Sequence, residues 1–137
     1  MIPETFTTYH LVKGEDLNHH GTLYAGRTAE WFVEAGFIAA ASLTRPENIM
    51  CLKIHGMTFT APVMPGALAK FDSKVILTGR TKIIVCIKLS SEGKEVVKGF
   101  ITFINVDSNH KAFPHGKVIE PLTEEERLLY EEAKALQ

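Results

Sequence analysis

Two carboxylates lie in a stretch that is otherwise apolar, and two histidines stand just before it. The stretch LNHHGTLYAGRTAEWFVEAGFIAAASL covers residues 17–43 and carries Glu30 and Glu34. Carboxylates on a helix are usually solvated or paired, but in a reactive site they act as a general base or as a nucleophile. Asn18 could orient a water molecule through its amide, or it could only turn the loop. These residue types are compatible with a hydrolytic site, although by themselves they favour solvated or paired carboxylates.

A helix must position these groups. It is expected to begin between Tyr24 and Arg27 and to end near Leu43, because Pro46 blocks continuation. The start of a helix supplies free N–H groups and the positive end of the helix dipole. A carbonyl oxygen that gains negative charge is stabilised there, as in an oxyanion hole. Gly26 suits this place because it has no side chain to keep a substrate from the backbone.

Alternating apolar and polar residues predict five strands around this helix. One strand precedes the helix and four follow it, which favours a four-strand meander and an α+β fold with an antiparallel five-stranded sheet wrapped around one long central helix. Thr123 and Glu126 have the spacing of a capping box, which predicts a C-terminal helix over about 122–136. The expected strands are 6–12, 50–60, 69–77, 83–89 and 96–106.

Composition and charge narrow the class of protein. The 137 residues are typical of one domain, residues 1–137, with 45% hydrophobic and 23% charged residues. A net charge of −1 without a basic block excludes an electrostatic nucleic-acid binder. No leader-like segment opens the chain, and the apolar stretch 31–43 is shorter than a membrane span, so we expect a cytoplasmic protein that does not use the membrane. Cys51 and Cys86 lie in apolar strand-like runs, which favours buried reduced thiols.

Four segments together resemble the hotdog acyl-CoA thioesterases, in the branch of the bacterial short-chain acyl-CoA hydrolases and the brain acyl-CoA hydrolase. The resemblance spans about residues 5–115. It implies a hotdog fold, self-association as a dimer, tetramer or hexamer, and hydrolysis of an acyl-CoA thioester without a cofactor other than the coenzyme A of the substrate. The segments are NHHGTLYAG at 18–26, VEAG at 33–36, IHGMTFTAPVMPG at 54–66 and TGRTKI at 78–83.

The resemblance also implies the catalytic positions. Asn18 matches the active-site Asn or Asp of the family, and Gly26 matches the second glycine at the helix start, whose N–H faces the thioester carbonyl. Ala25 replaces the first glycine. Many relatives place an acid seven residues after the second glycine, where this chain has Val33. Glu34 follows directly and can match the second of two adjacent acids that some relatives carry, so it is the expected base or nucleophile.

Glu34 and the helix start are too far apart to serve one site in one chain. Eight residues separate Gly26 from Glu34, or ~12 Å at ~1.5 Å per residue, which one water molecule cannot easily bridge. We therefore expect Glu34 of one subunit to act at Gly26 of another, with two active sites at a dimer interface. Glu30 lies one turn before Glu34 and is secondary in this interpretation: it is a structural residue, or the acid itself if the register is shifted.

Substrate contacts are expected in two further places. Arg80 and Thr81 lie in the turn where relatives contact the coenzyme A moiety, and an arginine offers bidentate contacts to phosphate. His19, Thr22 and His55 are candidate substrate contacts, although packing is the favoured role of His55. The two adjacent histidines have no Asp, Glu or Cys at ligand spacing, so no metal site is expected.

Two other functions remain open. A hotdog enoyl-CoA hydratase or dehydratase needs a histidine with an acid, and this function is disfavoured because NHHG is not followed by an aspartate at the expected spacing. A non-catalytic acyl-CoA-binding module is the second alternative, and the exchange of the usual acid for Val33 favours it. Release of thiol from acyl-CoA separates both from a thioesterase.

Overall fold

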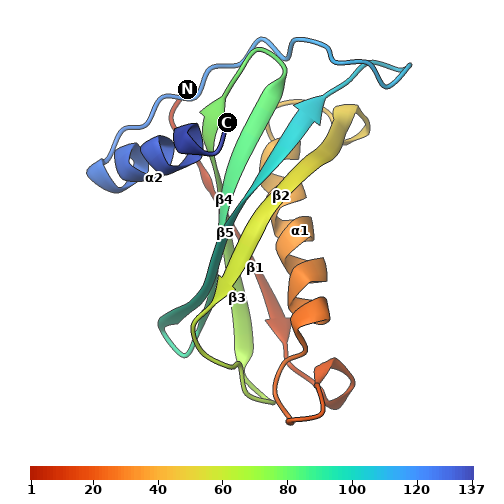
Figure 1. Ribbon diagram of the computed structural model, residues 1–137, viewed down its shortest axis with the longest axis vertical. Coiled ribbons are helices and arrows are strands. Elements are labelled where there is room, and N and C mark those ends of the chain that lie inside the picture. The colour runs from red at the N-terminus through yellow and green to blue at the C-terminus, as the bar shows by residue number, and fades with distance from the viewer.

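The computed structural model describes residues 1–137. One five-stranded antiparallel sheet carries α1 on its inner face and α2 on its outer face (Figure 1). This confirms the predicted α+β hotdog class, a sheet wrapped around one long helix with a second helix at the C-terminus. The elements are β1 (Thr5–Leu11), α1 (Ala25–Ala41), β2 (Ile49–Phe59), β3 (Leu68–Thr78), β4 (Lys82–Ser91), β5 (Lys94–Asn105) and α2 (Glu124–Ala135), with short 3-10 turns at Gly14–Asp16 and Pro46–Asn48.

The predicted four-strand meander is wrong in one place. The strand order is β1-β3-β4-β5-β2, so β2 pairs with β5 at the far edge and does not pair with β3. The cause is the segment 60–67, which reads as a hairpin turn but crosses the end of the molecule. The N–H of Leu23 donates to the Val63 carbonyl at 2.9 Å, and the N–H of Gly66 donates to the Val12 carbonyl at 2.8 Å. These bonds carry the chain over the loop that precedes α1.

Helix α1 is buried on one side only, although its sequence is largely apolar. Phe32 and Ala39 are completely buried against the sheet. A Cβ added to Gly36 would lie 3.1 Å from Cδ1 of Ile87, which shows how closely the helix backbone approaches β4. Small residues on the buried side of α1 permit this short distance between the helix backbone and β4. The opposite side faces solvent and includes Glu30, Glu34 and Ile38.

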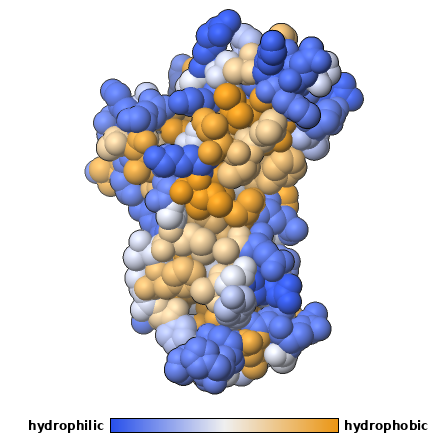
Figure 2. Space-filling model, turned by 45° about the vertical axis from the view of Figure 1, so that its right-hand side comes forward, coloured by the Kyte–Doolittle hydropathy of each residue, from blue (hydrophilic) through white to orange (hydrophobic).

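Strand β2 is the least covered part of the sheet. Only Ile49 is buried, whereas Ile54 and Phe59 are 49% and 48% exposed. Cys51 is exposed as well, so its predicted burial is wrong, because β2 is an edge strand whose outer side has no neighbour. Cys86 on β4 is buried, as predicted. Figure 2 brings the side with α1 and β2 forward and shows hydrophobic surface along its middle, with hydrophilic surface at both ends.

A bulge bends β2 near its middle. Gly56 has a φ of 115°, a conformation that residues with a side chain rarely adopt. On β5, a Cβ added to Gly99 would clash with the Gly56 carbonyl oxygen and lie 2.8 Å from Cζ of Phe32. The two glycines therefore allow the strands and α1 to meet closely at this point.

An ion pair between a buried carboxylate and a partly exposed lysine fixes α2 to the outer face. The predicted capping box is present: Oγ1 of Thr123 accepts from the N–H of Glu126 at 3.1 Å, and Oε1 of Glu126 accepts from the N–H of Thr123 at 3.0 Å. Oε2 of Glu126 lies 3.0 Å from Nζ of Lys74 on β3. Burial raises the pKa of Glu126, but the N–H groups of Thr123 and Leu122 and the Lys74 ammonium outweigh it and lower the pKa to about 2. Neither helix is long and apolar enough to cross a membrane.

Candidate active site

Asn18 closes the loop that leads into α1. Its Oδ1 accepts from the N–H of His20 at 2.9 Å and from the N–H of Thr22 at 3.2 Å, while its Nδ2 donates to Oγ1 of Thr22 at 3.1 Å. The only other acceptor near Nδ2 is the Leu23 carbonyl, at 3.5 Å. The amide thus shapes a turn, as the side chain of a loop asparagine commonly does. Nδ2 therefore makes one hydrogen bond of ordinary length and one long hydrogen bond within the chain.

The first turn of α1 leaves three backbone N–H groups without an acceptor. They belong to Ala25, Gly26 and Arg27, and the N–H of Thr28 is the first to find one, the Tyr24 carbonyl at 3.0 Å. Tyr24 occupies the N-cap position and provides no side-chain hydrogen bond. The first turn contains no acidic residue that would offset the positive end of the helix dipole. The start of α1 therefore presents donors to an oxygen that gains negative charge.

The ring of Tyr24 lies over Gly26. A Cβ added to Gly26 would clash with this ring, with Cζ of Tyr24 only 2.9 Å away. Tyr24 is 57% exposed, so the ring also forms part of the surface around the free N–H groups. Space for the Tyr24 ring is thus a second reason for a glycine at position 26, besides the expected access for a substrate. Sequence reasoning missed Tyr24, and its place at the N-cap of the helix was the signal that could have revealed it.

A buried carboxylate anchors the same turn. Asp16 is 5% exposed, and its Oδ2 accepts from the N–H of Lys13 at 2.9 Å. Its Oδ1 lies 3.1 Å from Nε of Arg27, and Nη1 of Arg27 lies 3.6 Å from Oε2 of Glu30. The Asp16 carbonyl also accepts from the N–H of Tyr24 at 2.9 Å. The sequence did not reveal Asp16, because an aspartate in a turn-rich loop reads as a turn residue.

Glu34 is exposed and turns toward β1. Its side chain is 61% exposed, and its nearest ionisable neighbour is His10, with Nε2 at 3.9 Å from Oε1. The His10 ring stacks on Trp31 with the ring centroids 4.2 Å apart. Glu34 is therefore free of a tight ion pair, but it lies on the side of α1 that faces β1. Strands β1 and β2 form the two opposite edges of the sheet.

The predicted coenzyme A contacts lie at the other end of α1. The N–H of Asn105 donates to the Thr81 carbonyl at 2.8 Å, and the N–H of Val106, directly after β5, donates to the carbonyl of Asn48, which follows α1. Figure 1 shows the turn between β3 and β4 at the same end as the C-terminus of α1, and the loop 18–24 at the opposite end. Arg80 and Thr81 are thus not brought to Gly26 within one chain.

Comparison of the sequence with known protein families identifies the family of this chain. Residues 20–98, which include all of α1, match the thioesterase superfamily. The chain belongs to the thioesterase superfamily. The matched part begins two residues after Asn18 and ends within β5.

Individual thioesterases are similar over most of the chain. An uncharacterized acyl-CoA thioester hydrolase of Bacillus subtilis (strain 168), YkhA, is 28% identical over 124 residues, which cover 86% of this chain and 71% of YkhA. The crystal structure of an acyl-CoA hydrolase from Bacillus cereus is 26% identical with a TM-score of 0.90, covering 96% of this chain and 83% of the other. A hexameric acyl-CoA thioesterase in its apo form is 27% identical with a TM-score of 0.88, covering 96% of this chain and 86% of the other.

Two of the predicted substrate contacts of this superfamily member, His19 and Thr22, lie in the Asn18 loop next to the start of α1. His19 is exposed, and its ring lies 4.0 Å from the ring of His20, measured between centroids. No group of three or more His, Cys, Asp or Glu side chains is placed to hold a metal ion. The loop therefore groups Asn18, His19 and Thr22 beside the free N–H groups.

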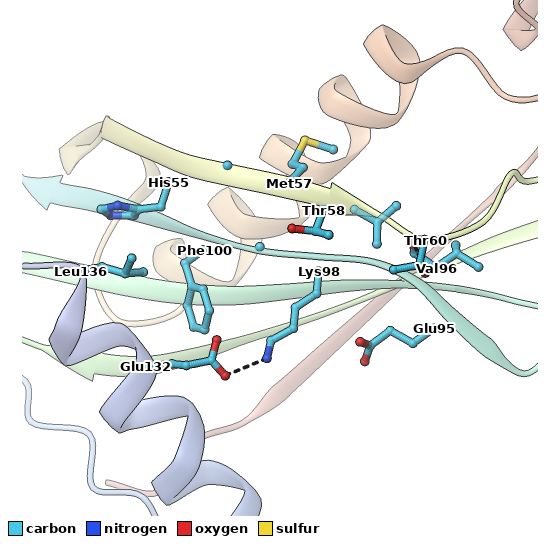
Figure 3. Close-up of a pocket in the computed structure, with 13 residues that line it drawn as sticks. His55, Met57, Thr58, Thr60, Glu95, Val96, Lys98, Phe100, Glu132 and Leu136 are labelled. Carbon is cyan, nitrogen blue, oxygen red and sulfur yellow. Dashed lines mark hydrogen bonds and ion pairs between the residues drawn. The ribbon is translucent and has the colours of Figure 1, made fainter.

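His55 lies on the other face of the sheet, away from α1. It lines a cavity of about 600 Å³ between β2, β5 and the end of α2 (Figure 3). Nε2 of His55 lies 2.7 Å from Oγ1 of Thr102, and Nζ of Lys98 lies 2.8 Å from Oε1 of Glu132 in the same cavity. Burial and the charge of Lys53 lower the pKa of His55, so its ring is neutral at pH 7. The structure does not bring His55 to the start of α1.

Proposed function

We propose that this protein hydrolyses acyl-CoA thioesters to a free acid and coenzyme A. The observation that carries the proposal is the start of α1, where three N–H groups have no acceptor in a chain of the thioesterase superfamily. The acyl-CoA hydrolases of two Bacillus species, similar over most of the chain, support the class of substrate.

The chemistry follows from the free donors. The carbonyl oxygen of the thioester docks at the N–H groups of Ala25, Gly26 and Arg27. Attack of water on the carbonyl carbon moves negative charge onto this oxygen, and collapse of the tetrahedral intermediate breaks the carbon–sulfur bond. Loss of one such donor typically costs ~3–4 kcal/mol of transition-state stabilisation. A helix start of this kind can therefore supply a large part of the catalysis.

The attacking water needs a group that orients it and a carboxylate that activates it. We propose Asn18 for the first task, because the second hydrogen bond of its Nδ2, to the Leu23 carbonyl, is long at 3.5 Å and can give way to a water molecule. The sequence suggests Glu34 of a second copy for the second task, as base or nucleophile. Its 61% exposure and the absence of a tight ion pair support this role. Glu34 of the same chain lies ~12 Å from Gly26, too far for one water.

A second copy is proposed to dock along β2. The strand lacks a neighbour on one side, and half-exposed apolar residues such as Ile54 and Phe59 follow it. Antiparallel pairing of two β2 strands would bring the β3–β4 turn of one copy toward the start of α1 in the other. Arg80 and Thr81 could then contact the coenzyme A bound there. Hexameric thioesterases are among the similar structures, which supports self-association.

A non-catalytic acyl-CoA-binding module is the second candidate. Val33 favours it, because an apolar side chain stands where many relatives carry an acid, and Glu34 turns toward β1. Such a module would bind the thioester at the same donors and release no thiol.

The deciding experiment is a panel of acetyl-, butyryl- and palmitoyl-CoA with a chromogenic disulfide reagent that reports released thiol. We expect thiol release well above the rate in buffer for at least one of them. Binding of coenzyme A esters without thiol release would favour the module. Loss of the enoyl absorbance of crotonyl-CoA without thiol release would favour a hydratase. Lys111→Ala, at an exposed site outside the proposed machinery, is the matched control for protein quality.

A further inference from the structure

The segment that follows β5 is hydrogen-bonded to the turn between β3 and β4. The N–H of His115 donates to the Arg80 carbonyl at 3.3 Å, and Nε2 of His115 lies 3.2 Å from the Lys82 carbonyl oxygen. The same Lys82 carbonyl accepts from the N–H of Gly79 at 2.9 Å, which closes the turn. Figure 1 shows the segment passing this turn on its way to α2. One histidine thus contacts the backbone of the turn on both sides of Thr81.

A third hydrogen bond identifies which nitrogen of the His115 ring carries the proton. Nδ1 accepts from the N–H of Lys117 at 3.0 Å, so Nδ1 has no proton. A carbonyl oxygen can only accept, so the proton lies on Nε2, which donates to the Lys82 carbonyl. The hydrogen bonds therefore assign the neutral Nε2–H form of the ring. Gly116 has a φ of 69°, which residues with a side chain rarely adopt, and this turn returns the N–H of Lys117 to the ring.

A buried asparagine makes a second link between the turn and the segment. Asn105, the last residue of β5, is 2% exposed. Its N–H donates to the Thr81 carbonyl at 2.8 Å, and its Nδ2 donates to the Phe113 carbonyl at 2.7 Å. The N–H of Phe113 donates to the Asn105 carbonyl at 2.9 Å. The turn and the segment are therefore joined at two points, by Asn105 in the interior and by the half-buried His115.

Three cations lie on the joined segments without an anionic partner. Arg80, Lys82 and Lys117 are exposed and take part in none of the ion pairs of the chain. Neither the turn 78–83 nor the segment 111–119 contains an acidic residue. In a chain with a net charge of −1, this is a local excess of positive charge. Unpaired arginine and lysine side chains attract phosphate groups, and an arginine can bind one through two hydrogen bonds.

We propose that His115 is a positioning residue for the substrate, which holds Lys117 beside Arg80 and Lys82 so that the three cations together bind the phosphate groups of coenzyme A. The inference rests on the proposed thioester hydrolysis and on the proposed second copy, at whose α1 the thioester docks. Coenzyme A carries a diphosphate and a 3′-phosphate on its nucleotide. Cations that are fixed before the substrate arrives lose less conformational entropy on binding than cations on separate mobile loops. His115 itself does not contact the reacting atoms.

A substrate without phosphate separates positioning from a general loss of structure. Acyl-pantetheine carries the same thioester as acyl-CoA but lacks the nucleotide and all of its phosphate groups. His115→Ala removes both hydrogen bonds of the ring. We expect it to raise KM for acyl-CoA by about fivefold, the factor that one net hydrogen bond contributes, with kcat within about twofold. The kcat/KM for acyl-pantetheine should stay within about twofold of that of the unaltered protein.

Three further variants identify what the ring contributes. His115→Gln keeps a donor for the Lys82 carbonyl, so it should restore most of the affinity for acyl-CoA that His115→Ala loses. Lys117→Ala removes a cation and keeps the N–H that binds the ring, so KM should rise for acyl-CoA and not for acyl-pantetheine. Lys111→Ala is the matched lysine control, because Lys111 lies in a separate loop that Asp107 closes. It should leave KM for both substrates unchanged.

Two results would overturn the inference. Equal losses of kcat/KM for acyl-CoA and acyl-pantetheine in His115→Ala would make the residue structural only, and an unchanged KM for acyl-CoA would leave it without a role in binding. Calorimetry with adenosine 3′,5′-bisphosphate tests the same cations without turnover, and its Kd should rise about fivefold in His115→Ala. If the unaltered protein releases no thiol but binds this nucleotide in a manner that depends on His115, the proposed function fails and the phosphate contacts stand. If thiol is released and neither measurement responds to His115→Ala, only the inference about His115 fails.

Discussion

The variant Gly26→Ala tests whether position 26 lacks a side chain to give the substrate access to the helix start or only to leave space for the Tyr24 ring. The new methyl group would clash with the ring of Tyr24, whose Cζ would lie 2.9 Å away. Because Tyr24 is 57% exposed, the ring can swing into solvent, at about 0.5–1.5 kcal/mol for an unfavourable rotamer. Alanine recovers about 0.5–1 kcal/mol relative to glycine in a helix. The free energy of unfolding should therefore change by less than about 1 kcal/mol.

Activity should respond far more strongly than stability. A methyl group at Gly26 keeps the thioester carbonyl away from the free N–H groups, and loss of one such donor lowers kcat by ~10²–10³-fold. The assay is thiol release, with the thermal midpoint measured in parallel. Tyr24→Ala combined with Gly26→Ala is the matched control, because it removes the ring and leaves the methyl group.

Two results would refute the reasoning. If Gly26→Ala keeps kcat within about threefold, the carbonyl does not dock at this N–H. If the double variant regains the activity of Tyr24→Ala alone, the glycine serves only the tyrosine ring. Low activity in both variants with nearly unchanged thermal midpoints is the expected result.

Three further predictions follow from the packing and the charges. Glu126→Gln should lower the free energy of unfolding at pH 7 by about 2 kcal/mol, below the ~3–5 kcal/mol of a fully buried pair because Lys74 is partly exposed. Its carboxyl has a folded pKa of about 2 against an ordinary 4.5, so the native protein should lose this stability as the pH falls from 4.5 to 2, and urea titrations of the variant should lack the loss. Arg80→Ala should raise KM for acyl-CoA with kcat nearly unchanged, as steady-state kinetics would show. At protein concentrations too low for the proposed pairing along β2, Cys51 should react with a thiol reagent in the native protein, whereas Cys86, whose pKa burial raises to about 11, should react only on unfolding.

The sequence predicted the positions of the strands better than it predicted which strands pair with each other. The alternating runs at 69–77 and 83–89 lie within β3 and β4, because side chains on a strand alternate between its two faces. The pairing of β2 with β5 was not predictable from this pattern. It depends on segment 60–67, whose hydrogen bonds to Val12 and Leu23 join parts of the chain that are far apart in sequence.

In the candidate site, too, features set by neighbouring residues were predictable, whereas contacts between residues far apart in the sequence were not. The turn around Asn18 and the helix start at Gly26 are local features, and the sequence indicated both. The burial of Asp16 depends on Arg27, a residue of another element, so no local pattern revealed it. His55 was placed with the site because of its motif, but it hydrogen-bonds to Thr102 on the outer face beside the bulge at Gly56.

The open edge of β2 has a consequence for handling the protein. A strand with unpaired backbone groups and half-exposed apolar side chains attracts any extended segment that it meets, including segments of unfolded chains. Occupation of that edge by another folded copy removes the hazard and links stability to concentration by mass action. The midpoint of thermal unfolding should consequently rise with protein concentration.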